Sequence, residues 1–152
     1  MNSSKSAGNK RLMALGIVAA SALFFMANCS GQTDVVEIGE RMYIGQVNDI
    51  YLNADDYLGK TIKLEGVLKK FATWDRDYYL VVRYGTDECC DDTPIGFEVA
   101  WARNQSFPEP ESWVEAIGVL RTEKVNDFYS YLYLDLSSLN VLSRRGAEFV
   151  RQ

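Results

Sequence analysis

The stretch that decides the fold is residues 61–68, which read Thr61-Ile62-Lys63-Leu64-Glu65-Gly66-Val67-Leu68. Apolar residues and one glycine occupy every second position of it, namely Ile62, Leu64, Gly66 and Leu68. Successive side chains of a β-strand point to opposite faces, so this period of two predicts a strand with one buried face. A glycine in the middle of such a strand is typical of a sharp bend, as in a small closed barrel.

Four further stretches are expected to be strands. The period of two recurs in residues 95–101 and 113–120, and Gly118 repeats the central glycine. Residues 78–84 (YYLVVRY) and 129–136 (YSYLYLDL) are rich in aromatic and β-branched side chains, which favour strands. An earlier strand is expected at residues 41–47 (RMYIGQV). Turn-forming residues separate these stretches, and the connection 104–112 contains Pro108 and Pro110, which oppose a strand there.

One short helix is expected before residue 61. Asn53 is expected to cap its N-terminus, and Asp55 and Asp56 are favourable at the positive, N-terminal end of the helix dipole. Gly59 is expected to terminate the helix. No other stretch after residue 33 shows a sustained period of 3.6. A short helix followed by five strands predicts an all-β domain over residues 38–152, a five-stranded OB-like Greek-key barrel. A β-sandwich is the alternative, and residues 144–150 are expected to pack on the barrel as a short tail.

The composition limits the chemistry. The chain has 152 residues, enough for one domain, with three cysteines and no histidine. Without histidine the chain lacks Ser-His-Asp and Cys-His catalysis, the H-E-x-x-H zinc motif and a histidine pH switch. No other catalytic set is recognisable, so we expect a protein that is not an enzyme.

The charge argues against nucleic acid as a partner. The formal net charge is -5, with 16 basic and 21 acidic residues. Residues 1–28 hold three of the basic residues and none of the acidic ones, so residues 29–152 carry 13 against 21, or -8. Nucleic-acid binding depends on clustered Lys and Arg that displace counterions.

The N-terminal segment is typical of an exported lipoprotein. Lys5, Lys10 and Arg11 precede an apolar run, residues 12–27, whose 16 residues suit a signal peptide better than a membrane span, which needs about 20. Met26-Ala27-Asn28-Cys29-Ser30 follows and resembles a bacterial lipobox. We therefore expect a signal peptide over 1–28, a lipidated Cys29 and a tether over 29–37. The protein would then lie at the cell membrane or outer envelope, outside the cytoplasm. The alternative is an uncleaved anchor helix.

One acidic segment combines thiols and carboxylates, Asp87-Glu88-Cys89-Cys90-Asp91-Asp92. We expect it in the loop before the strand at 95–101, with three alternatives open. In the first alternative, the thiols form a strained disulfide or merely pack beside the barrel. In the second, they bind a soft or borderline ion such as zinc or copper(I), with carboxylates completing the coordination shell. Or Cys89 and Cys90 perform redox chemistry, although neighbouring carboxylates disfavour the thiolate. Beyond such a metal ion, no cofactor is firmly expected.

Aromatic residues offer a second candidate surface. They recur on two expected strands, at Tyr78, Tyr79, Tyr84, Phe128, Tyr129, Tyr131 and Tyr133. Exposed rings would stack on a ligand or dock a partner protein, whereas buried rings would only build the strands.

Three motifs together resemble a family. They are residues 48–53 with 57–62, Cys89-Cys90 followed by Pro94-Ile95-Gly96, and Tyr133-Leu134-Asp135. The chain is similar, over residues 38–152, to a poorly characterised family of bacterial membrane-associated proteins. This resemblance implies an OB-like soluble part that often accompanies a predicted membrane permease.

These observations favour a non-enzymatic, lipid-anchored binding or accessory module for a membrane partner, such as a permease or an envelope protein. Its task would be the handling of a metal or a small solute. Two alternatives remain, a thiol redox protein using Cys89 and Cys90 and a structural protein of the cell envelope.

Overall fold

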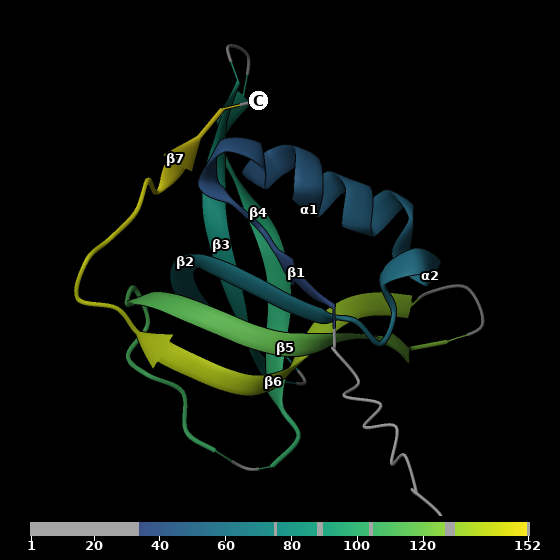
Figure 1. The fold of residues 1–152 in the computed structure, drawn as a ribbon. Helices are drawn as coiled ribbons and strands as arrows, with labels where there is room; N and C mark the ends of the chain where they lie inside the picture. The colour runs from purple at the N-terminus through teal and green to yellow at the C-terminus, as the bar shows by residue number, and fades with distance from the viewer. Residues whose placement is uncertain (1–33, 75, 88–89, 104, 127–129, 152) are drawn as a thin grey trace, which may run out of the picture. The chain divides into compact units, whose positions relative to one another are not determined.

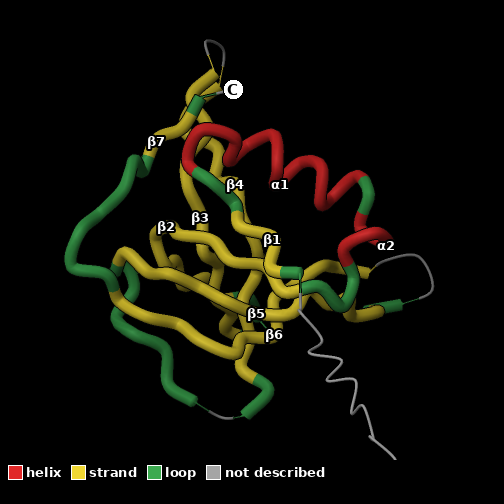
Figure 2. Tube along the Cα trace, in the orientation of Figure 1, coloured by secondary structure: helices red, strands yellow, loops and turns green. Residues whose placement is uncertain are grey.

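The structure is a computed structural model that describes residues 34–151 except 75, 88–89, 104 and 127–129 (Figure 1). Its elements in chain order are β1 (Val35–Glu37), a 3-10 helix (Glu40–Met42), α1 (Tyr43–Leu52), α2 (Ala54–Tyr57), β2 (Thr61–Ala72), β3 (Asp77–Asp87), β4 (Cys90–Trp101), β5 (Trp113–Lys124), β6 (Ser130–Val141) and β7 (Phe149–Val150). Figure 2 shows the helical residues gathered before β2 and strands making up most of the rest.

Five strands close into a barrel. Their neighbours run β2-β5-β6-β4-β3, and a further pairing of β2 with β3 completes the ring. All these pairs are antiparallel except β4 with β6, which is parallel. This is the Greek-key order of an OB barrel, so the predicted all-β, OB-like architecture is confirmed. Two short strands extend the ring in parallel, β1 beside β2 and β7 beside β3.

The predicted bend at Gly66 is where β2 changes partners. Residues Thr61–Val67 of β2 pair with β5, and residues Val67–Ala72 pair with β3. A Cβ atom at Gly66 would lie 2.5 Å from the Val82 carbonyl oxygen, so only glycine permits this approach of the two backbones. Gly118 lies at a register shift between β5 and β6. Both glycines therefore serve the closure of the barrel, as the sequence predicts.

The helix α1 corrects one prediction. Residues 41–47 were expected to be a strand, but the chain is helical from Glu40 to Leu52. The side chains of Tyr43, Ile44, Val47 and Ile50 are buried and form an apolar stripe along one side of α1. Figure 1 shows α1 passing in front of β3 and β4, and the Tyr51 ring stacks on Phe97 of β4. This packing stabilises a helix whose apolar stripe is only two turns long.

The short helix before β2 is confirmed as α2, and Asn53 occupies its N-cap position as predicted, but without a side-chain cap. The Asn53 side chain makes no capping hydrogen bond, and its Nδ2 donates instead to the Asp49 carboxylate at 2.7 Å. Gly59 follows with a φ of +81°, a backbone conformation that favours glycine at a helix end.

The remaining connections agree with the sequence. The described residues between β4 and β5 contain no helix. Phe107 from this connection stacks on Tyr79 with ring centroids 3.9 Å apart, so the connection packs against the barrel. The predicted C-terminal tail is present as β7, where the Tyr84 N–H donates to the Glu148 carbonyl oxygen at 2.8 Å.

Candidate functional site

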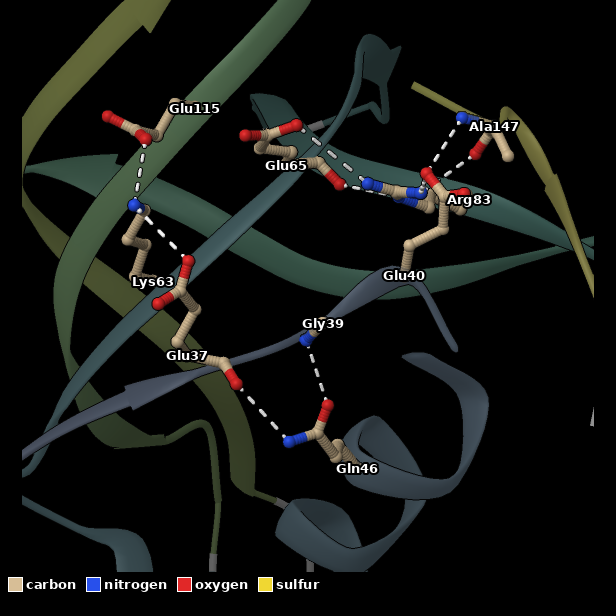
Figure 3. A network of polar contacts seen from close by, with 9 residues as sticks. All are labelled: Glu37, Gly39, Glu40, Gln46, Lys63, Glu65, Arg83, Glu115 and Ala147. Carbon is tan, nitrogen blue, oxygen red and sulfur yellow. Dashed lines mark hydrogen bonds and ion pairs between the residues drawn. The ribbon is translucent and has the colours of Figure 1, made fainter. Parts of the chain in front are cut away.

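A buried arginine joins the barrel to both of its flanking segments (Figure 3). Arg83 of β3 is only 2% exposed. Its Nε donates to the Glu65 carbonyl oxygen at 2.8 Å, and its Nη1 donates to a Glu40 carboxylate oxygen at 3.1 Å and to the Ala147 carbonyl oxygen at 3.0 Å. The guanidinium also lies over the rings of Tyr43 and Trp113.

Glu40 completes this Arg83 cluster, which consists of Glu40, Glu65, Arg83 and Ala147. The Ala147 N–H donates to Glu40 at 3.1 Å, and this bond, together with the Arg83 guanidinium, lowers the pKa of the Glu40 carboxyl below its usual value. The cluster thus connects the 3-10 helix, β2, β3 and the C-terminal tail. Because Arg83 is buried and its hydrogen bonds end on groups of this chain, we assign the cluster a structural role.

A groove on another face of the barrel has the features of a binding site. Three adjoining hollows of about 620, 590 and 440 Å³ all include Glu98 and Tyr131. Their other residues come from the β2–β3 turn, the start of β3, the end of β4, the end of β5 and the start of β6. The largest hollow extends to Tyr51 of α1 and to α2. We name this surface the β3–β6 groove.

Arg76 lines two of the three hollows and pairs with Glu98, which lines all three. Its two terminal nitrogens donate to the two carboxylate oxygens of Glu98 at 2.5 and 3.0 Å. Its guanidinium carbon lies 5.2 Å from the Tyr78 ring centroid and 5.1 Å from the Tyr131 ring centroid. The fork geometry and the ring contacts hold the arginine in one orientation.

Two further polar pairs lie in the groove. The Tyr131 hydroxyl donates to a Glu123 carboxylate oxygen at 2.9 Å, and the Arg121 Nε donates to Asp135 at 3.0 Å. Burial and the Glu123 hydrogen bond raise the pKa of Tyr131 to about 12. The phenol therefore stays protonated at neutral pH and remains a donor.

Exposed apolar side chains lie in the groove or next to its lining residues in sequence. Val125 after β5 lines one hollow and is 57% exposed, and Trp74, which follows the lining residue Thr73 in the β2–β3 turn, is 97% exposed. Phe71 stacks on Tyr78 with ring centroids 5.5 Å apart. An almost fully exposed tryptophan leaves a large apolar surface in water, so it marks a place for contact with a ligand or partner.

Some of the aromatic residues that were predicted to form a surface line the groove, whereas others pack within the fold. Tyr78, Tyr131 and Tyr133 line the groove. Tyr79 packs on Phe107 and Tyr84 packs beside Phe149, so these two rings are part of the fold. Phe128 and Tyr129 lie outside the described residues. Asp55 faces the largest hollow, while the Asp56 side chain, also at the start of α2, is not among its lining residues.

Sequence patterns alone missed Trp74, Arg76 and Glu98. Two signals were available: a tryptophan within the polar turn 74–77, and a charged residue between Phe97 and Val99 on the outward face of β4. Glu98 pairs in register with Leu80 on one side and Tyr133 on the other, which places its carboxylate between the two aromatic strands.

The described residues of the acidic cysteine segment, Asp87 and residues 90–92, lie in strands rather than in a loop. β3 ends at Asp87 and β4 begins at Cys90, and the two residues pair in register. Asp91 and Asp92 therefore belong to β4, which corrects the predicted loop. These residues are extended and not looped because the pairing of β3 with β4 continues beyond Pro94 to Cys90. Glu88, Cys89 and Cys29 lie outside the described residues, so the disulfide, metal and redox alternatives and the lipidation of Cys29 stay predictions.

Two observations concern metal binding and membrane-spanning helices. Within the described part of the chain, no group of three Cys, Asp or Glu side chains is placed to hold a metal ion. In the same part, no helix is long and apolar enough to cross a membrane.

The comparison with known proteins agrees with the resemblance seen in the sequence. No curated protein matches the chain. The model of the DUF1980 C-terminal domain, an uncharacterised family, matches residues 25–147 and thus covers the barrel from β1 to β6. The chain belongs to the DUF1980 C-terminal domain family.

Proposed function

We propose that this chain is a non-enzymatic binding module, anchored to a membrane through lipid on Cys29, and that it binds its ligand or partner in the β3–β6 groove. The observation that supports this most is the position of the groove. OB barrels bind ligands on their second and third strands, between the loop joining strands one and two and the loop joining strands four and five. Here those parts are β3 and β4, the β2–β3 turn and the β5–β6 connection.

The proposed biological role is that of an accessory to a membrane partner such as a permease, to which the module presents a small solute. The same fold serves many functions, so the proposed role must rest on the side chains of the groove. These provide oriented hydrogen-bonding groups, a fixed arginine and exposed aromatic rings, the features that small-molecule sites share. Metal handling or redox chemistry at Cys89 and Cys90 remains the second proposal and depends on residues beyond the groove.

A photo-crosslinking experiment tests the use of the groove. Val125 on the groove rim and Val141 at the opposite end of β6 are both 57% exposed, so they form a matched pair. Each is replaced by a photoreactive phenylalanine analogue in the full chain, which is then irradiated in intact bacteria. We expect a defined adduct from position 125 and none from position 141. Equal adducts at both positions, or none at either, would overturn the proposal.

The anchor has its own test. Cys29→Ala should leave the signal peptide unprocessed or release the protein from the membrane fraction, because a lipid chain contributes roughly 0.8 kcal/mol per buried methylene. Intact mass and membrane fractionation measure both outcomes, with Cys90→Ala as the control that keeps the anchor. Unchanged mass and unchanged partitioning of Cys29→Ala would contradict lipidation.

A further inference from the structure

The groove has the shape of a site for an extended ligand. Its three hollows meet at Glu98 and Tyr131; one reaches α2, and the other two include Arg76 and reach Val125 and Asp135. Each has a volume in the range that binding sites for small ligands use. Because the hollows adjoin one another, a ligand with several similar units would fill them together.

The charges of the groove nearly balance, and four of them form two ion pairs. Among its described residues, three cations (Arg76, Arg121 and Lys124) stand against four anions (Asp55, Glu98, Glu123 and Asp135). Arg76 is bound by Glu98 and Arg121 by Asp135. A phosphodiester chain would meet no excess of positive charge here, although such an excess is what binds nucleic acid. The balance favours a ligand without net charge.

The paired groups still offer many oriented donors and acceptors. A carboxylate oxygen accepts more than one hydrogen bond, and a guanidinium has five N–H donors, so a pair such as Arg76 and Glu98 retains capacity toward a ligand. Hydroxyl groups both donate and accept, which lets a polyhydroxylated ligand bind next to such pairs without separating them.

The aromatic rim supplies the apolar half of the recognition. A sugar ring presents C–H groups of slightly positive charge, and these pack on the negative face of an aromatic ring. Trp74 offers such a face, being 97% exposed, and Tyr133 lines the groove beside Tyr131. Covering an exposed indole is favourable at about 25 cal/mol per Å² of apolar surface.

We infer that the β3–β6 groove binds a neutral oligosaccharide chain, with Trp74 stacking on one sugar ring and the Arg76–Glu98 pair binding hydroxyl groups of another. This inference rests on the groove being the binding surface and adds the chemical class of the ligand. A peptide is the competing class, and it becomes an outcome of the test.

The test uses the full chain in detergent, titrated separately with maltohexaose, cellohexaose and chitohexaose. Calorimetry measures the affinity, and tryptophan fluorescence measures contact, because Trp74 is far more exposed than Trp101 and Trp113. We expect one of the three to bind with a blue shift in emission, and an oligothymidylate to give no signal. Trp74→Ala should weaken the binding at least about tenfold. The control Met42→Ala, an exposed apolar truncation before α1, should leave the affinity unchanged.

Two outcomes separate this inference from the proposed function. If none of the hexasaccharides binds at about 5 mM, a concentration at which even weak specific sites fill, the glycan inference is overturned. If the crosslinked adduct at position 125 then contains a polypeptide, the groove remains the binding surface and its ligand is a protein. Binding that Trp74→Ala and Met42→Ala weaken equally would also overturn the inference.

Discussion

Gly96→Ala is expected to cost about 3 kcal/mol or more of the free energy of unfolding, as overpacking against a rigid neighbour does. Gly96 pairs with Val82 where β3 and β4 are both inside the barrel wall. A Cβ atom at position 96 would lie 2.0 Å from the Val81 carbonyl oxygen and 2.9 Å from the Val82 Cα atom. These atoms belong to the backbone, so they cannot rotate away as the end of a side chain would.

The backbone around this clash between the added Cβ atom and β3 cannot easily move apart. Val81 and Val82 are fully buried, and the Gly96 carbonyl oxygen accepts a hydrogen bond from the Tyr51 hydroxyl at 3.0 Å. Separating β3 from β4 would therefore also disturb the packing of α1. A loss of this size should lower the midpoint of thermal unfolding by roughly 10 to 20 °C, measured by circular dichroism.

Gly45→Ala is the matched control, because it adds the same methyl group in open space. The nearest atom to a Cβ at position 45 is the Met42 Cε at 3.9 Å, and Gly45 lies inside α1. Alanine in a helix interior is more stable than glycine by about 0.5–1 kcal/mol, so this variant should unfold at a higher temperature than the wild type. Equal stability of the two variants would contradict the account of Gly96.

The strands were predictable because the alternation of apolar and polar residues that produces them lies within each segment of the sequence. The alternation around Leu64, Phe97 and Ala116 follows from one buried face per strand, and those faces are buried in the barrel. The structure extends each of these strands, since pairing continues beyond the apolar core into polar residues. The bend of β2 was predictable from Gly66, but the order in which the strands pair was not, because it depends on contacts between distant segments.

The helix α1 and the groove were not predictable for a different reason. Ile44 and Val47 are β-branched and suit a strand locally, and only packing against β3 and β4 makes this segment helical. The groove joins Arg76 to Glu98, 22 residues apart, and Glu98 to Tyr131 across the parallel β4–β6 pair. Such a pairing depends on the topology, so no pattern within one strand indicates it.

Arg83→Met is expected to destabilise the barrel by about 3 kcal/mol, because it removes the three hydrogen bonds that a buried, charged guanidinium donates. The Glu65 and Ala147 carbonyl oxygens would each lose a hydrogen bond, and Glu40 would lose its cation. Arg83→Lys should recover only part of this stability, since a single ammonium group lacks the planar fork that reaches these acceptors from one buried position. Chemical denaturation at neutral pH measures both variants.

Arg121→Met is the control for the loss of a cation. The Arg121 side chain is about half exposed, and its pair with Asp135 lies at the surface, so its removal should cost less than about 1 kcal/mol. Hydrogen exchange adds a local readout. In Arg83→Met the Tyr84 N–H, which donates to Glu148, should exchange faster because the tail is no longer held. Unchanged exchange at Tyr84 would contradict the role of Arg83 in holding the tail.

The same cluster predicts a response to acid. The hydrogen bond from the Ala147 N–H, and then Arg83, lower the pKa of Glu40 in the folded protein below its usual value of 4.5. A carboxyl whose pKa is lowered by folding stabilises the protein above its unfolded pKa, and this contribution is lost as the pH falls through the folded pKa. Glu40→Gln should therefore reduce stability at pH 7 and flatten its decline below about pH 4.5. A parallel decline in the variant and the wild type would show that Glu40 is not the group responsible.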